Sequence, residues 1–196
     1  MKRLFDIMFS LFGLLLIWPI LLIVSILIKL TDGGSVFYRG VRVGRNGKPF
    51  RMFKFRSMVV NADKIGGPST AGDDPRFTPI GIFLRKWKLD ELPQLIDVFR
   101  GTMSFVGPRP EVPFYINLLT DEEKKLILSV RPGITDYASL WNFNEAEILR
   151  GAADPEKAYQ EKIWPEKKRL QIKYVQERSF FLDITLILQT AVKIFR

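Results

Sequence analysis

The chain has 196 residues, 47% of them hydrophobic, and it contains no His and no Cys, which excludes imidazole bases, thiolate nucleophiles, disulfide scaffolds and the usual zinc ligand sets. Its net charge is +9, and residues 1–60 alone hold ten basic but only two acidic side chains. This positive N-terminal part suits anionic lipid headgroups and phosphorylated ligands, whereas no zinc-finger, RNP or basic-zipper pattern supports nucleic acid.

Residues 7–28 form an uncharged apolar segment. As a straight helix it would be roughly 33 Å long, enough to cross a bilayer core of about 30 Å. However, Pro19 removes a backbone hydrogen bond and kinks a helix, and basic residues flank both ends, which the positive-inside rule draws to the cytoplasmic side. The residues alone therefore leave two alternatives open: a spanning helix, and a re-entrant helix broken at Pro19 that returns to the same face.

A β-hairpin is predicted next, because an Asn-Gly pair lies between residues 36–43 and 49–56, which are rich in β-branched and aromatic side chains. Strand alternation puts Lys54 and Arg56 on one face. That face can meet a phosphate, or it can simply be solvated.

Residues 61–79 are rich in Gly, Pro and Asp and have no apolar period. So long a loop is unusual in a compact domain and indicates a mobile or functional segment. A short basic helix is then predicted over residues 80–89, and it carries Arg85 toward the acidic pair that follows.

Two adjacent carboxylates, Asp90 and Glu91, precede an apolar helix that is expected to end at Gly101. Asp90 suits the N-cap, and Pro93 is tolerated in the first turn. The positive end of this helix would then face Asp90 and any phosphate beside it. The pair could supply a nucleophile together with a metal ligand or proton acceptor. The plainer alternative is that both residues serve only the start of the helix.

Arg109 and Arg131 each lie beside Pro. Pro restrains the backbone and so lowers the entropy cost of presenting a guanidinium group, which recognises phosphate in a bidentate manner. One such arginine usually marks a turn, but two of them with a carboxylate pair favour an anion site. Residues 142–179 are interpreted as solvated packing helices, and residues 180–195 as a helix that lies in the membrane interface or closes the core.

Together, these motifs resemble the bacterial sugar transferase family, the small monotopic phosphoglycosyl transferases that begin glycan assembly on a polyprenyl phosphate. The resemblance covers nearly the whole chain up to residue 135, and several motifs in a fixed order make it specific. The matching motifs are Lys2–Asp6, Phe53–Met58, Leu89–Leu95, Ser104–Pro110 and Arg131–Thr135.

The motifs and the resemblance predict an α+β fold. It consists of a mostly helical cytoplasmic, membrane-associated catalytic domain over residues 31–196 with a small β-hairpin, and a re-entrant membrane helix over residues 1–30, broken at Pro19. Both ends of that helix would lie on the cytoplasmic face of the bacterial inner membrane, so the protein would be monotopic. The expected partners are a UDP-sugar, polyprenyl phosphate and the phospholipid bilayer. Nucleic acid is not expected as a partner, and a homodimer is one possible assembly.

The resemblance implies a two-step transfer of a sugar-1-phosphate from a UDP-sugar to polyprenyl (undecaprenyl) phosphate, with release of UMP, as the first membrane step of bacterial glycan assembly. The aspartate that matches Asp90 would attack the β-phosphate and hold the phosphosugar covalently. Glu91 would be its partner, and both carboxylates would lie at Mg²⁺, which typically uses one or two carboxylates plus substrate phosphate oxygens.

Five further residues are expected to bind substrate. By the same resemblance, Arg85 would grip phosphate, Arg109 would serve the nucleotide phosphates and Arg56 would support the pocket. Lys54, on the basic strand face, and Arg131, beside its Pro, complete the predicted set.

The sequence departs from the family pattern in two places. The helix break reads Trp18-Pro19, so the family's Ser before Pro is missing, and Asp136 replaces the common Gly after Ile-Thr. Residues 137–144 also lack the usual Gln-rich continuation, so sugar recognition by this segment cannot be carried over and the donor sugar is left open. The alternative function is a basic membrane-anchored scaffold that binds anionic lipid or RNA without turnover, but it does not explain the acidic pair beside two Pro-flanked arginines.

Overall fold

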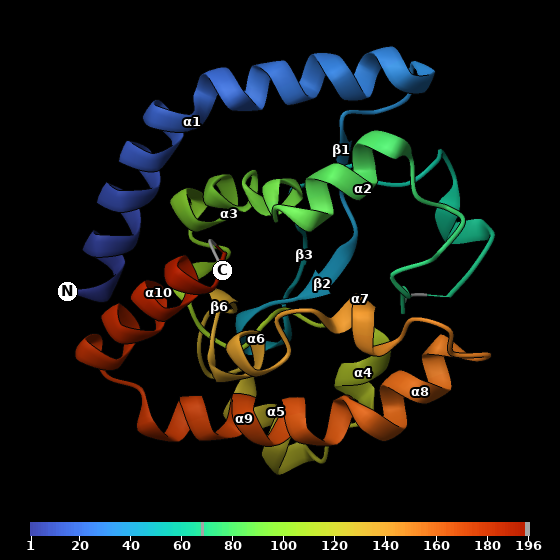
Figure 1. Cartoon of the computed structure of the whole chain (residues 1–196). Coiled ribbons are helices and arrows are strands. Elements are labelled where there is room, and N and C mark those ends of the chain that lie inside the picture. The colour runs from blue at the N-terminus through green and yellow to red at the C-terminus, as the bar shows by residue number, and fades with distance from the viewer. Residues whose placement is uncertain (68, 195–196) are drawn as a thin grey trace.

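The structure is a computed structural model that describes residues 1–67 and 69–194 (Figure 1). It is mostly helical with a few short strands, as the sequence predicts. The helices are α1 (Lys2–Asp32), α2 (Pro79–Lys86), α3 (Gln94–Arg100), α4 (Pro113–Asn117), α5 (Asp121–Ile127), α6 (Tyr137–Trp141), α7 (Glu145–Ile148), α8 (Pro155–Lys162), α9 (Trp164–Glu177) and α10 (Phe180–Ile194). The strands are β1 (Phe37–Tyr38), β2 (Val41–Val43), β3 (Pro49–Arg51), β4 (Lys54–Phe55), β5 (Ser104–Val106) and β6 (Gly133–Thr135).

The apolar helix α1 is bent but continuous. Its hydrogen-bonded helix includes Pro19 and ends at Gly33, whose left-handed backbone (φ 69°) lets its N–H close onto the carbonyl of Lys29. The ribbon nevertheless changes direction sharply between two legs that follow the outside of the domain (Figure 1). A proline removes one hydrogen bond of the helical ladder and leaves the rest in place, so a bend needs no interruption.

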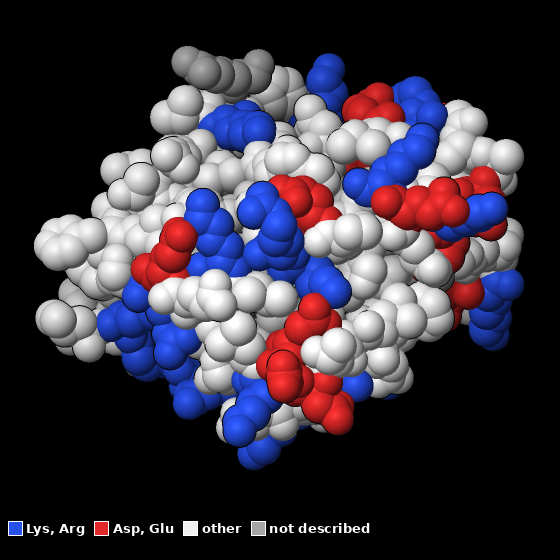
Figure 2. Space-filling view, turned by 90° about the horizontal axis from the view of Figure 1, so that it is seen from below, with Lys and Arg blue, Asp and Glu red and all other residues white. Residues whose placement is uncertain are grey.

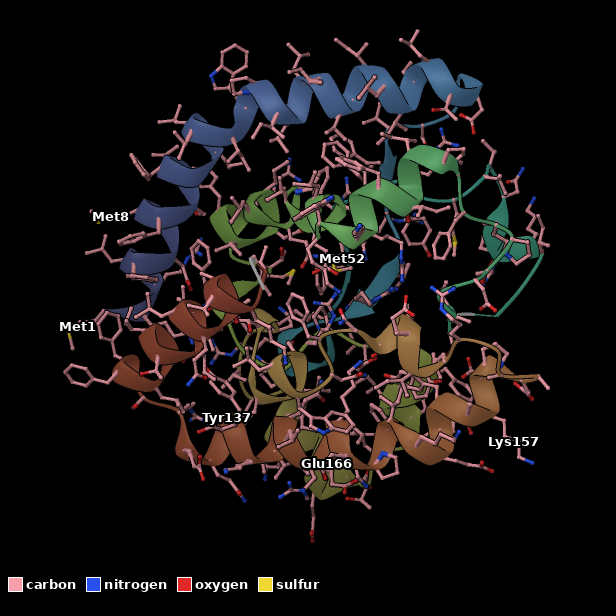
Figure 3. All side chains as sticks on the ribbon, viewed as in Figure 1. Met1, Met8, Met52, Tyr137, Lys157 and Glu166 are labelled. Atoms are coloured by element: carbon pink, nitrogen blue, oxygen red, sulfur yellow. The ribbon has the colours of Figure 1, made fainter. Side chains whose placement is uncertain are left out.

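Most of the α1 surface faces outward. Its most apolar window has a mean hydropathy of 2.9 and is only 11% buried, and among the described residues α1 alone has the length and composition to cross a membrane. Met8 lies on the outer side of the first leg, whereas Met52 lies inside the molecule beneath α3 (Figure 3). One stripe of the second leg, with Val24 and Ile28, packs against Phe55.

The N-terminal leg of α1 is held to the domain by polar side chains. The buried carboxylate of Asp6 accepts hydrogen bonds from the Ser104 hydroxyl at 3.1 Å and the Phe105 N–H at 3.2 Å. The Lys2 ammonium pairs with Asp183 of α10 at 2.6 Å. These contacts give the motif Lys2–Asp6 a structural role, because its charged residues attach α1 to β5 and α10.

The second leg of α1 is fastened by Arg56. Its guanidinium forms a two-pronged ion pair with Asp32 at the helix end, and its Nε donates to the Ser35 carbonyl at 2.6 Å. Both ends of α1 are thus tied to one folded domain.

The predicted β-hairpin is confirmed. Strand β1 pairs with β4, and β2 pairs with β3, both in antiparallel orientation. Phe37 lies opposite Phe55 and Val41 lies opposite Arg51, so the two strand pairs continue the same register. Asn46 (φ 58°, ψ 28°) and Gly47 (φ 74°) adopt the left-handed angles of a type I′ turn. The hairpin therefore delivers Lys54 of β4 to a defined place in the middle of the molecule.

A parallel strand pair that the sequence analysis did not predict joins the two Pro-Arg segments. Ser104 pairs with Gly133 and Val106 with Thr135. The backbones approach so closely that a Cβ on Gly133 would lie 2.1 Å from the Gly107 nitrogen. Only glycine fits at this position, because real side chains never come that near to a backbone atom.

The C-terminal helices close the domain on the side opposite to the second leg of α1. One face of α10 packs into the core through Leu186, which is fully buried, while Phe181 is 84% exposed. The predicted closing of the core is therefore confirmed for one face of α10, whereas its placement in the membrane interface stays a prediction. Residue 195 of the predicted segment lies outside the described residues. Around α9, positive and negative side chains alternate on the surface (Figure 2), as expected for solvated packing helices, and Arg169 pairs with Glu166.

We expect Gly133→Ala to destabilise the protein, because the new methyl group collides with the backbone of the β5 loop. Such overpacking costs about 1–3 kcal/mol, and the thermal unfolding midpoint in detergent, followed by circular dichroism, should fall. Gly67→Ala is the matched control, since the nearest atom to its new Cβ would lie at an ordinary 3.9 Å. Equal midpoints for the two variants would contradict the close approach.

Candidate active site

A cavity of about 2140 Å³ lies in the middle of the domain. The hairpin, the region of α2, the loop after β5, and α6, α7 and the end of α10 contribute to its walls. Four of the predicted substrate-binding residues and one of the two predicted catalytic acids line it, namely Lys54, Arg56, Arg85, Arg109 and Glu91.

Asp90 and Glu91 lie in a single 3₁₀ turn, Leu89–Glu91, that precedes α3. The prediction that Asp90 caps this helix is wrong: α3 begins at Gln94 and its N-cap, Pro93, makes no side-chain bond. Lys88 adopts a left-handed backbone (φ 54°) just before the turn, and successive backbone bonds of 3₁₀ type lead into α3. The Asp90 carboxylate is therefore free to meet a cation. The helix does end at Gly101 (φ 84°), as predicted.

Lys54 holds both carboxylates together. Its ammonium lies 2.9 Å from Oδ2 of Asp90 and 3.3 Å from Oε1 of Glu91. Asp90 is only 1% exposed and is not among the residues that line the cavity. An ammonium has three N–H donors, so these two contacts leave Lys54 one donor for a ligand.

Glu91 also forms an ion pair with Arg109. Burial by itself would raise the pKa of Glu91, but the Arg109 guanidinium and the Lys54 ammonium outweigh it and hold that pKa well below its usual range. The same pairing raises the pKa of Arg109. Glu91 is therefore a carboxylate throughout the neutral range, although it is largely withdrawn from water.

The position of Arg109 depends on the backbone around it. Prolines flank it on both sides, Gln171 of α9 donates to its carbonyl at 3.2 Å, and its guanidinium also approaches the carbonyl of Ile134 in β6 at 3.4 Å. The predicted rigidity of this arginine is thus supported by contacts from α9 and from the parallel strand pair.

Two further cations border the same region. The guanidinium of Arg85 lies 4.6 Å above the ring of Phe77, and Lys88 donates to the carbonyl of Phe143 at 2.9 Å. Burial lowers the pKa of Lys88. Within the described residues neither side chain forms an ion pair with a carboxylate, so both can bind an anionic ligand. Lys88 was not predicted as a site residue, although its place two residues before Asp90 is a signal that could have found it.

The other two predicted binding residues have structural partners. Arg56 borders the cavity but is 7% exposed and is committed to Asp32. Arg131 does not line the cavity, and its Nε donates to the carbonyl of Gly101 at 2.8 Å, at the end of α3. The structure brings Lys54, Arg109 and the acidic pair together and places Arg131 apart from them.

The segment from Asn142 to Glu145 and the buried Lys167 were not predicted to belong to the site, yet they line the same cavity. The 61–79 loop, of which residue 68 is not described, also reaches it and is pinned where the Gly72 N–H donates to the Ala146 carbonyl at 2.7 Å. The composition of the 61–79 loop indicated a mobile or functional segment, whereas no motif in the sequence distinguishes residues 142–145 or Lys167 as site residues.

The acidic pair suits a divalent cation that is bound mainly through a substrate. Among the described residues no three acidic side chains cluster as a ready-made metal site. One oxygen of each carboxylate faces Lys54, and the other oxygens make no hydrogen bond within the described part of the chain. Two adjacent carboxylates with free oxygens, completed by phosphate oxygens, are a typical Mg²⁺ ligand set.

Comparison with known proteins gives a consistent result. Residues 1–196 match the family described as bacterial sugar transferase. The exopolysaccharide production protein ExoY of Sinorhizobium fredii is 34% identical over 96% of this chain and 83% of its own length. A putative undecaprenyl-phosphate N-acetylgalactosaminyl 1-phosphate transferase of Bacillus subtilis is 46% identical over 62% of this chain and 68% of its own.

A longer relative shares the same region. The UDP-glucose:undecaprenyl-phosphate glucose-1-phosphate transferase of Escherichia coli is 36% identical over 100% of this chain, which corresponds to 40% of the E. coli protein. The family match covers the whole length of this chain, and the acidic pair lies beside Lys54 and Arg109. This chain therefore belongs to the bacterial sugar transferase family.

Proposed function

We propose that the protein transfers a sugar-1-phosphate from a UDP-sugar to polyprenyl (undecaprenyl) phosphate and releases UMP. The observation that carries the proposal is the pair formed by the buried Asp90 and the partly buried Glu91, held by Lys54 and Arg109 at the edge of a large cavity. A scaffold without turnover has no need of two acids neutralised by Lys54 and Arg109 beside cations that form no ion pair within the described part of the chain, Arg85 and Lys88. The names of the relatives given above point to the same donor and acceptor classes.

In the first step, a carboxylate oxygen of Asp90 attacks the β-phosphorus of the UDP-sugar. The bond from that phosphorus to the bridging oxygen breaks, UMP leaves with the bridging oxygen, and the phosphosugar remains esterified to Asp90. In the second step, a phosphate oxygen of polyprenyl phosphate attacks the same phosphorus and the aspartate leaves. The product is a polyprenyl-diphosphate sugar, and the enzyme returns to its starting state.

The cations around the pair have distinct tasks. The remaining N–H of Lys54 can donate to a phosphate oxygen and so bring the β-phosphate over Asp90. Arg109 holds Glu91 ionised and presents further donors to the diphosphate. Arg85 and Lys88 stabilise the negative charge that develops on the departing UMP.

Glu91 and Asp90 would hold Mg²⁺ together with substrate phosphate oxygens. When bound, the ion would neutralise the diphosphate and make UMP a better leaving group. Because Glu91 keeps a low pKa, it is available as a carboxylate ligand at neutral pH.

The site works at a membrane surface, with residues 1–30 as the membrane segment and 31–196 as the catalytic domain on the cytoplasmic side. We propose that α1 is re-entrant. This is supported by the contacts at its two ends, since Asp6 binds β5 and Asp32 binds Arg56 of the same domain. A helix that crossed the bilayer would place these ends about 30 Å apart on opposite faces.

Asp90→Asn is expected to reduce UMP release by on the order of 10³-fold or more, because an amide is not a nucleophile toward phosphorus. Wild-type protein incubated with UDP-sugar and Mg²⁺ without acceptor should gain the mass of one phosphosugar on Asp90, measured by mass spectrometry. Asp121→Asn, on the exposed first turn of α5, is the control. Full turnover of Asp90→Asn, or an adduct on another residue, would refute the covalent mechanism.

Arg109→Gln should move the acidic limb of the kcat/KM profile to higher pH. In the wild type, the guanidinium keeps the pKa of Glu91 low, so Glu91 stays ionised as the pH falls; without it, burial raises that pKa and protonation begins nearer neutrality. Activity is then lost earlier as the pH decreases. Arg169→Gln, on the exposed face of α9, is the control. An acidic limb that Arg109→Gln leaves unmoved would argue against the pairing.

The re-entrant topology can be tested because the chain has no Cys of its own. Single cysteines at Leu4 and Leu30, which are 63% and 77% exposed at the two ends of α1, should both react with a membrane-impermeant maleimide in inside-out vesicles. Neither should react in right-side-out vesicles. Labelling of the two positions from opposite sides would instead indicate a spanning helix.

A further inference from the structure

The wall of the cavity formed by α6 and α7 contains a buried amide with an unused acceptor. Asn142 lies between the two helices, lines the cavity and is 8% exposed. Its Nδ2 donates to Oε2 of Glu145 at 3.1 Å. Its Oδ1 is buried and has no hydrogen-bond partner.

The orientation of this amide follows from its partner. The Glu145 carboxylate can only accept hydrogen bonds, so the NH₂ group of Asn142 must face it and the carbonyl oxygen must face away. Buried carbonyl groups are nearly always hydrogen-bonded in native proteins. An unpartnered carbonyl oxygen in a residue that lines this cavity therefore points to a donor supplied by the ligand.

The wall that carries Asn142 is held in place by buried charges. Lys167 of α9 lies 3.5 Å from Glu145, pairs with Glu111 at 2.8 Å and donates to the Tyr159 hydroxyl at 2.7 Å. Lys167 and Asn142 thus approach the same carboxylate oxygen of Glu145, Oε2, which restrains Glu145 next to the amide. The amide is positioned before any ligand arrives, which is what selective recognition requires.

The same wall is adjacent to the acidic pair. Lys88, two residues before Asp90, donates to the carbonyl of Phe143, the residue that follows Asn142. With the diphosphate held by the cations near Asp90, the group bonded to the attacked β-phosphorus is the sugar. We propose that Oδ1 of Asn142 accepts a hydrogen bond from a hydroxyl or amide N–H of the donor sugar and thereby sets the donor preference, with Glu145 and Lys167 as positioning residues.

This inference rests on the proposed function and concerns a segment in which the chain departs from the family pattern. It predicts that the preference among sugars, and not the handling of uridine or of the acceptor, depends on Asn142. Donors that differ in one hydroxyl or in an acetamido group are the natural probes, because a site built to bond one substrate group discriminates against donors that lack it.

The test uses Asn142→Leu, which keeps the branching at Cγ but has no polar atoms, and Asn142→Ala as a second variant that adds no volume. UMP release is measured for UDP-glucose, UDP-galactose and their two N-acetylhexosamine counterparts, with UDP as a competitive inhibitor. We expect kcat/KM for the preferred donor to fall on the order of tenfold more than for the least preferred one, while inhibition by UDP and the KM for polyprenyl phosphate stay unchanged. Asn117→Leu, at the exposed end of α4, is the control.

The ratio between donors is measured on one preparation, so partial unfolding of a variant cannot change it. An equal loss for all four donors, an unchanged donor ratio, or a parallel weakening of UDP inhibition would each overturn the assignment to the sugar. If the wild-type protein releases UMP and the variants keep the wild-type donor ratio, only this inference is refuted. Wild-type protein that releases UMP from none of the donors refutes the proposed function as well.

Discussion

The ion pairs that join Glu91 to Arg109 and both acids to Lys54 are the constraint on which the site depends. Two neighbouring carboxylates in one tight turn, largely withdrawn from water, would repel each other and favour protonation. Two cations relieve that repulsion, and they come from different parts of the chain. Lys54 is delivered by the hairpin, and Arg109 by the loop after β5. The hairpin register and the parallel pair of β5 with β6 are thus requirements of the site and not only of the fold.

The membrane-type helix and the cavity share their supports. Asp6 bonds to Ser104 at the start of β5, the strand that leads to Arg109, and Asp32 bonds to Arg56, two residues after Lys54. Each end of α1 is therefore attached to a segment that carries one of the two cations of the site. The position of α1 on the domain and the geometry of the acidic pair are set by the same short stretches of backbone.

Sequence reasoning reached the features that depend on local chemistry. The Asn-Gly turn predicts the hairpin, Gly101 the end of α3, and the acidic pair with Lys54 and Arg109 the centre of the site. It missed what depends on distant partners. The three-residue strands β5 and β6 are too short to show a periodic pattern. Lys88 has a left-handed backbone, so Asp90 does not cap α3 as expected and instead contacts Lys54. Arg131 bonds to Gly101, 30 positions away, and Asn142 bonds to Glu145 only three residues ahead, but no motif marks that pair as part of a site.

The attachment of the N-terminal leg has a consequence for how the protein is made. Lys2 finds its partner Asp183 across 181 positions of sequence, and Asp6 finds Ser104 across 98. During synthesis, α1 is translated before Ser104 and long before Asp183, so the polar residues of its N-terminal leg have no partners when they are made. Docking of the N-terminal leg is therefore complete only after α10 has been translated, and a chain that stalls earlier would lack the contact between Lys2 and Asp183.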